Sequence, residues 1–189
     1  MEEKFLQDLL KDERIQWSGQ PETSVVFSPA DIFLVPFSLL WGGFAIFWEI
    51  SVLCIGSKSG SGSSLAFPLF GIPFVLIGLY FIFGRFLLKN FKKKKTYYAI
   101  TDKRVIVLTE MMGRNVQAAF IDHIPSVNKS IRANGIGTIR FGSSNMMSSM
   151  YGNTGMELFG AAYGQDVPVF YDIKEANKVY NLVMGLRTK

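Results

Sequence analysis

The sequence has almost none of the residues from which catalytic and metal sites are built. Its 189 residues include one cysteine, Cys54, and one histidine, His123. A single cysteine excludes a disulfide within the chain, and two such residues are too few for a structural zinc site. We therefore expect neither a metal site nor a bound cofactor.

Enzyme motifs are also missing. There is no G-x-S-x-G motif, no phosphate-binding glycine loop and no acidic pair at a catalytic spacing. Asp122 and His123 are adjacent, so on a strand they would point to opposite faces, and we interpret His123 as a turn residue. The glycines of residues 134–137 are typical of a hairpin turn. We predict that the protein is not an enzyme and has no catalytic residues.

Charge is scarce and unevenly placed: 19% of the residues are charged, whereas 49% are hydrophobic. Two apolar runs of 24 residues, 32–55 and 65–88, contain one charged residue each, Glu49 and Arg85. A helix of that length reaches roughly 36 Å, enough to cross a hydrocarbon core of about 30 Å. The polar stretch 56–64 joins the runs. We predict a transmembrane hairpin of two helices.

The orientation of this hairpin follows from its flanking lysines and arginines. The connecting loop carries only Lys58, whereas the sequences at the other two ends are rich in lysine and arginine. The positive-inside rule then predicts that both termini are cytoplasmic, in the cytoplasmic (inner) membrane. The first residues, MEEKFLQDLLKDE, lack the basic start and apolar core of a signal peptide. We therefore expect the apolar segments themselves to direct insertion.

A basic cluster follows the second apolar run, with seven basic residues against one acid, Asp102. Beside a membrane span, such a cluster favours anionic lipid over nucleic acid. It either fixes the topology alone or also binds a lipid head group or an anionic partner, and both interpretations are open. Trp17, Trp48, Tyr97 and Tyr98 are predicted membrane-interface anchors. The predicted basic site consists of Lys89, Lys92, Lys93, Lys94, Lys95, Lys103 and Arg104.

The charges inside the apolar runs can be placed on an antiparallel hairpin. Arg85 comes near the start of the first helix, so we consider an ion pair between Asp31 and Arg85, against independent extension of both side chains to head groups. For Glu49 an ion path is the alternative to extension to the outer interface, which we favour. Gly71 and Gly78 lie seven residues apart and form a smooth strip for helix packing. Pro68 and Pro73 predict a kink in the second helix.

Outside the hairpin the periodicity changes. Residues 2–16 fit an amphipathic helix with Phe5, Leu6, Leu9 and Leu10 on one face, ended by a turn at 17–21. From Thr96 the alternation predicts short strands, and 174–186 a final helix. The predicted strands are 97–101, 104–109, 116–121, 126–132, 138–141 and 167–171.

The stretch 142–166 is rich in Gly, Ser and Met. Its Met146, Met147, Met150 and Met156 are a candidate Cu(I) site, but without a nearby His or Cys they fit an adaptable contact loop better.

These elements divide the chain into four parts. We predict an N-terminal amphipathic cytoplasmic segment (1–29), the transmembrane hairpin (30–88), a basic collar (89–95) and a cytoplasmic β domain (96–189). The fold class is a membrane-anchored α+β protein, whose β-barrel or sandwich is capped by the C-terminal helix.

Three stretches, YYAITDKRVIV, GIGTIRFGS and PVFYDIKEANKVYNLV, together with WSGQP, carry a family likeness. With the paired apolar runs, the chain resembles the bacterial pleckstrin-homology (PH) domain membrane proteins with a two-helix anchor, over about residues 17–186. The resemblance implies a strongly bent barrel of seven strands, with one end plugged by the C-terminal helix, and no catalytic residues.

A domain tethered by two helices has no need of lipid binding for recruitment. We therefore predict a non-enzymatic platform for protein interaction, assembly or regulation, with a membrane-protein partner or a homo-oligomer. Binding or sensing of anionic lipid head groups through the basic collar is the alternative. A transport role is the weakest hypothesis, and nucleic acid is not an expected partner.

Overall fold

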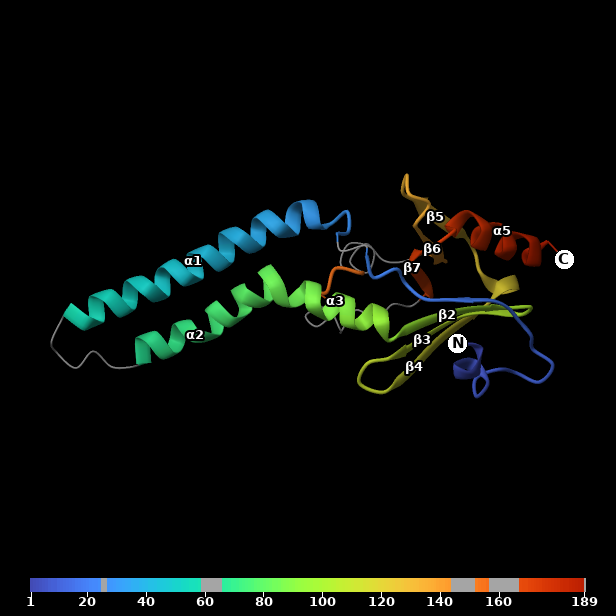
Figure 1. Ribbon diagram of the computed structural model, residues 1–189, viewed down its shortest axis with the longest axis horizontal. Coiled ribbons are helices and arrows are strands. Elements are labelled where there is room, and N and C mark those ends of the chain that lie inside the picture. The colour runs from blue at the N-terminus through green and yellow to red at the C-terminus, as the bar shows by residue number, and fades with distance from the viewer. Residues whose placement is uncertain (25–26, 59–65, 144–151, 157–166, 189) are drawn as a thin grey trace.

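The computed structural model is an elongated molecule with a helical hairpin at one end and a β domain at the other (Figure 1). It describes residues 1–24, 27–58, 66–143, 152–156 and 167–188. The hairpin and the two sheets of the predicted α+β fold are both present.

The hairpin consists of α1 (Asp31–Lys58) and a second helical arm made of α2 (Ala66–Leu79), a π-helical turn (Tyr80–Gly84) and α3 (Arg85–Lys94). Two stretches of the described chain, Asp31–Cys54 and Leu69–Lys94, are long and apolar enough to cross a membrane. The predicted hairpin is therefore confirmed as a pair of long apolar helices. The second arm continues through the lysines of the predicted collar.

The departure from α-helical geometry does not lie where the prolines predict it. Pro73 is accommodated inside α2, whereas the hydrogen-bond pattern changes at Tyr80–Gly84. A π-helical turn inserts an extra residue and so changes which face the following residues present. This irregularity directly precedes Arg85, the charged residue that α3 turns inward.

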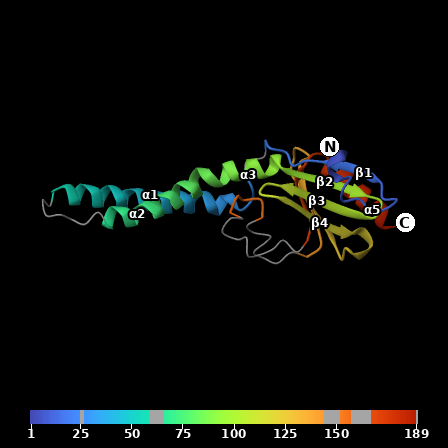
Figure 2. The same cartoon turned by 90° about the horizontal axis from the view of Figure 1, so that it is seen from below.

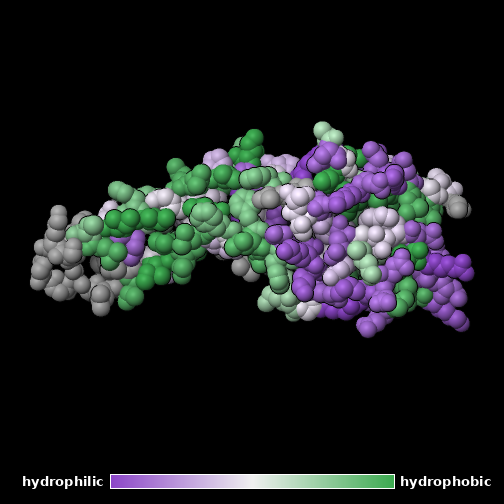
Figure 3. Space-filling model, in the orientation of Figure 1, coloured by the Kyte–Doolittle hydropathy of each residue, from purple (hydrophilic) through white to green (hydrophobic). Residues whose placement is uncertain are grey.

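Small residues form the contact between the two arms. A side-chain carbon added at Gly78 would lie 2.8 Å from the Cα of Gly42, so the two backbones meet there without side chains between them. The large apolar side chains point outward, and Figure 3 shows the hairpin surface as mostly hydrophobic and the domain surface as mostly hydrophilic.

The β domain contains two antiparallel sheets and the helix α5 (Ala176–Arg187). The four-stranded sheet has the order β1-β2-β3-β4 and the three-stranded sheet the order β5-β6-β7. No pairing between described strands joins the sheets, so the barrel is not closed in the described part of the chain. The strands are β1 (Ile15–Gly19), β2 (Thr96–Thr101), β3 (Arg104–Glu110), β4 (Arg114–Phe120), β5 (Val127–Ile131), β6 (Gly137–Phe141) and β7 (Val169–Ile173).

Strand β1 precedes the hairpin, yet it pairs with β2, which follows the hairpin: Trp17 lies opposite Ile100 and Gly19 opposite Tyr98. The helices are thus inserted between two neighbouring strands of one sheet (Figure 2). A unit made of residues 96–189 alone would lack this edge strand.

The predicted N-terminal helix and the turn after it are wrong. Only Glu2–Phe5 is helical, as one 3-10 turn, and Ile15–Gly19 is a strand. The apolar residues of this segment nevertheless become buried. Phe5 and Leu9 cover the outer face of the four-stranded sheet, where they pack on Ala99, Ile106 and Leu108. Pairing with β2 outweighs the local preference of these residues.

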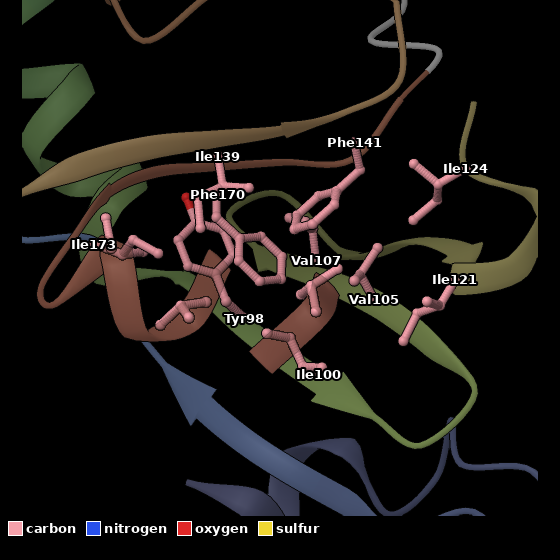
Figure 4. Packing of buried hydrophobic residues seen from close by; sticks show 13 residues of the cluster. Tyr98, Ile100, Val105, Val107, Ile121, Ile124, Ile139, Phe141, Phe170 and Ile173 are labelled. Atoms are coloured by element: carbon pink, nitrogen blue, oxygen red, sulfur yellow. The ribbon is translucent and has the colours of Figure 1, made fainter. Parts of the chain in front are cut away.

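The main core lies between the two sheets and α5 (Figure 4). Phe170 stacks on Tyr98 at 4.5 Å and meets Phe141 edge-to-face at 4.8 Å between ring centroids. α5 contributes Ala176, Val179 and Val183, which are buried at the helical spacing the sequence predicts.

Candidate functional site

The candidate site is the junction where α3 meets the β domain. Arg85, Lys89 and Lys93 are spaced four residues apart and therefore share one face of the helix. All three are buried, with at most 4% of each residue exposed. Lys94 and Phe91 lie on the exposed side. The run of four lysines is thus divided between the inside and the outside of the molecule.

Arg85 forms an ion pair with Asp31 at the start of α1, and both side chains are at most 3% exposed. The Nε of Arg85 donates to the carbonyl of Phe81 at 2.8 Å, while the carboxylate of Asp31 accepts from the hydroxyl of Ser28 at 2.7 Å. The sequence allowed either an ion pair or separate extension of these two side chains to head groups. In the structure they form the ion pair. They connect the beginning of the first arm to the end of the second.

Lys93 connects the same helix to strand β7. Its ammonium lies 2.7 Å from the carboxylate of Asp172, and both side chains are at most 4% exposed. Asp172 also pairs with Arg132 at 3.2 Å and accepts from the amide of Asn153 at 2.6 Å. Lys93 donates further to the carbonyl of Glu22 at 3.0 Å. Because buried charges need several partners, this cluster fixes α3 on the domain.

The segment 152–156 adds a third connection. Gly155 has a φ of +80° and lies so close to the backbone of Arg85 that an added side-chain carbon would be 2.0 Å from that carbonyl oxygen. The hydroxyl of Tyr80 donates to the carbonyl of Gly155. Only glycine fits this conformation and this approach without strain.

A cavity of about 170 Å³ lies beside the junction. Lys89, Lys92 and Lys93 line it, together with hydroxyl and amide groups from Thr96, Thr109, Asn115 and other residues. None of the described lining residues is acidic. Because the ammonium of Lys93 is already paired with Asp172, an anion in this cavity would meet Lys89 and Lys92.

The rest of the predicted basic site does not join this cavity. Lys94 and Lys95 are exposed, and Lys103 and Arg104 follow β2, about 20 Å along the strand at ~3.3 Å per residue. Arg104 pairs with Glu13 at 2.8 Å, and Lys103 donates to the carbonyl of Lys11 at 3.3 Å. These two residues hold the N-terminal segment on the sheet.

Glu13 is the acid of that second cluster. Burial alone would raise its pKa, but hydrogen bonds from Arg104, the backbone N–H of Leu10 and the hydroxyl of Thr101 outweigh burial, so the pKa lies below its usual value. The carboxylate therefore stays charged in the folded protein.

The predicted aromatic anchors lie in four different surroundings. Trp48 is half exposed on α1. Trp17 stacks on Phe170 at 5.8 Å, and Tyr97 lies below the ammonium of Lys4 at 4.4 Å. Tyr98 is buried in the core, where its oxygen accepts from the N–H of Tyr171 at 3.0 Å and burial raises its pKa.

Within the described part of the chain, the remaining candidate residues add no further site. One carboxylate oxygen of Glu49 is buried against Gly71 rather than extended away from the helices. Among the described residues no three His, Cys, Asp or Glu side chains gather as metal ligands. Met146, Met147 and Met150 lie outside the described residues, as does most of 142–166.

No local sequence pattern pointed to Asp172, Asn153 and Arg132, which come from distant parts of the chain. The spacing of Arg85, Lys89 and Lys93 was the signal that could have revealed an inward-facing stripe.

Together these observations define an α+β protein whose apolar helical hairpin is joined to a two-sheet domain by the buried ion pair of Lys93 and Asp172. No protein-family model, curated protein or solved structure matches this chain.

Proposed function

We propose that the protein is a two-span protein of the cytoplasmic membrane that presents a PH-like domain as a non-enzymatic platform for protein interaction, assembly or regulation. Both termini then lie in the cytoplasm. The PH-like assignment is supported by the four- and three-stranded antiparallel sheets followed by a C-terminal helix.

The observation that carries the platform is the charged junction. Arg85 and Lys93, eight residues apart on α3, make buried ion pairs with Asp31 on α1 and Asp172 on β7. The first pair joins the two arms and the second joins α3 to the domain; breaking the Lys93–Asp172 pair costs about 3–5 kcal/mol, so the domain is held in one orientation on the hairpin. A fixed orientation suits docking of a partner that is itself in the membrane, since less motion has to be frozen on binding.

A pull-down of the full-length protein in mild detergent, with mass and stoichiometry measured together, tests this function. We expect a stoichiometric membrane-protein partner or a defined homo-oligomer. Lys93→Met should weaken this association, whereas Lys94→Met, which removes the same charge from the exposed side of α3, should leave it unchanged. A lone monomer for the unaltered protein would overturn the platform.

Binding of anionic lipid head groups is the second candidate function. The favouring observation is the cavity lined by Lys89, Lys92 and Lys93, without an acidic residue in its described lining. Lys103 and Arg104 are not part of this candidate, because they pair with the N-terminal segment.

A further inference from the structure

A second, larger hollow of about 570 Å³ lies on the outer face of the three-stranded sheet. On β6, Ile139 and Phe141 point into the core, so Thr138 and Arg140, which alternate with them, point to the other side of the sheet. The chain that enters α1, residues 28–33, forms the opposite wall. This hollow, which we name the arginine groove, is separate from the lysine cavity, although Asn153 and Tyr171 line both.

The two ends of the arginine groove differ in chemistry. Pro29, Ala30 and Phe33 give it an apolar end; Phe33 is 74% exposed and belongs to the first turn of a helix that is apolar enough to cross a membrane. Arg132 and Arg140 line the end on the sheet, with the hydroxyl groups of Ser130 and Thr138. An apolar end beside the membrane helix and a cationic end on the domain match the two parts of a phospholipid.

The charge balance of the groove favours an anion. Its single described acid, Asp172, is 2% exposed and is already paired with Lys93 at 2.7 Å and with Arg132 at 3.2 Å. Arg140 adds a further positive charge to the same lining. The described lining therefore holds two guanidinium groups and one carboxylate, and guanidinium groups bind phosphate oxygens with well-directed hydrogen bonds.

We propose that the arginine groove binds the phosphate of an anionic phospholipid, with the acyl chains lying along the start of α1 beside Phe33. The inference rests on the proposed membrane position of the hairpin and is independent of any protein partner. It also differs from the lysine cavity, because its cations and its apolar wall belong to other elements.

Native mass spectrometry of the full-length protein in mild detergent, with added phosphatidylglycerol or phosphatidylcholine, tests the groove. We expect bound phosphatidylglycerol at higher occupancy than phosphatidylcholine. Arg140→Gln should lower the affinity by about tenfold or more, as expected for loss of hydrogen bonds to a charged group. Arg14→Gln removes an equal charge from an exposed side chain and should change nothing.

Two further variants keep the test decisive. Ser130→Leu fills the groove without changing its charge and should also reduce phosphatidylglycerol binding, whereas Lys92→Gln changes the lysine cavity alone and measures any lipid held there. Melting temperatures identify any variant that has lost its fold. Equal binding by Arg140→Gln and Arg14→Gln, or loss only in Lys92→Gln, would overturn the proposal.

Inorganic phosphate identifies the source of the bound group. If millimolar phosphate displaces phosphatidylglycerol from the unaltered protein and binds equally well alone, the lipid assignment is overturned in favour of a free phosphate. Persistence of the lipid in phosphate would support the phospholipid. A missing protein partner in the pull-down would leave either result unaffected.

Discussion

The hairpin and the β domain place their apolar side chains in opposite ways. In the hairpin Phe33, Leu40 and Phe47 are 74%, 75% and 67% exposed, and the glycines form the contact. In the domain Phe170 and Ile139 are completely buried. Each arrangement suits a different solvent, since lipid gives apolar helices no reason to bury large side chains against each other. The charged junction lies where these two arrangements meet.

We expect the largest effect from a substitution that leaves a cavity in the core of the β domain. Phe170→Ala should lower the free energy of unfolding by about 3–5 kcal/mol, because it removes a ring packed on Trp17, Tyr98 and Phe141. Thermal unfolding followed by circular dichroism measures this loss. Phe120→Ala, at a site 46% exposed, is the control and should cost far less. Similar losses in both variants would contradict a core centred on Phe170.

The junction should give the next largest effect and tests whether the two regions behave as one unit. Lys93→Met leaves Asp172 buried without its nearest cation and should cost about 3 kcal/mol. Lys94→Met removes a lysine from an exposed position and should cost less than 0.5 kcal/mol, roughly the size of a surface change. Denaturant unfolding in detergent compares them. Equal stability of the two variants would mean that the buried pair does not hold α3 on the domain.

In the hairpin we expect an enlarged side chain at the helix contact to be destabilising, whereas in the domain core the destabilising change is a smaller side chain. Gly78→Val places a side chain against the backbone of Gly42 and should destabilise helix packing by about 1–3 kcal/mol. Gly43→Val is the matched control, because nothing lies within 4 Å of a side-chain carbon there. Distances between spin labels on α1 and α2 report the separation of the arms. An unchanged distance in Gly78→Val would contradict the close glycine contact.

The smallest effect concerns the N-terminal segment and depends on pH. The pKa of Glu13 lies below its usual value of 4.5, so its pairing stabilises the fold above that pH and is lost as the pH falls through the lower folded value. Limited proteolysis of residues 1–14 should therefore increase in acid. Glu13→Gln should be cleaved readily at neutral pH and respond less to acid. An equal acid response in the variant would assign the effect to other carboxylates.

Periodicity predicted much of the fold, because many of its helices and strands are determined by residues close together in the sequence. The two apolar runs, the successive strands 97–101, 104–109 and 116–121, and the C-terminal helix all follow from residues close in the chain. The N-terminal segment is the exception, and periodicity predicted its structure wrongly. Its pattern fits a helix, but the partner that decides its structure, β2, lies about 80 residues later.

The candidate sites were partly predictable for the same reason. The lysine run is visible in the sequence, and so is the possibility of an Asp31–Arg85 pair. The division of the lysines into buried and exposed sets depends on the faces of α3 and on Asp172, which joins it from β7. No local pattern points to the arginine groove either, because Arg132, Arg140 and Phe33 come from separate elements.

By itself the sequence determined that two long apolar helices are followed by a strand-rich domain, because composition and periodicity act over short distances. The tertiary structure decided that the helices are inserted between β1 and β2, and which charges become buried partners. Those outcomes depend on contacts between residues far apart in the chain, and such contacts arise only when the two sheets pack against each other and α5.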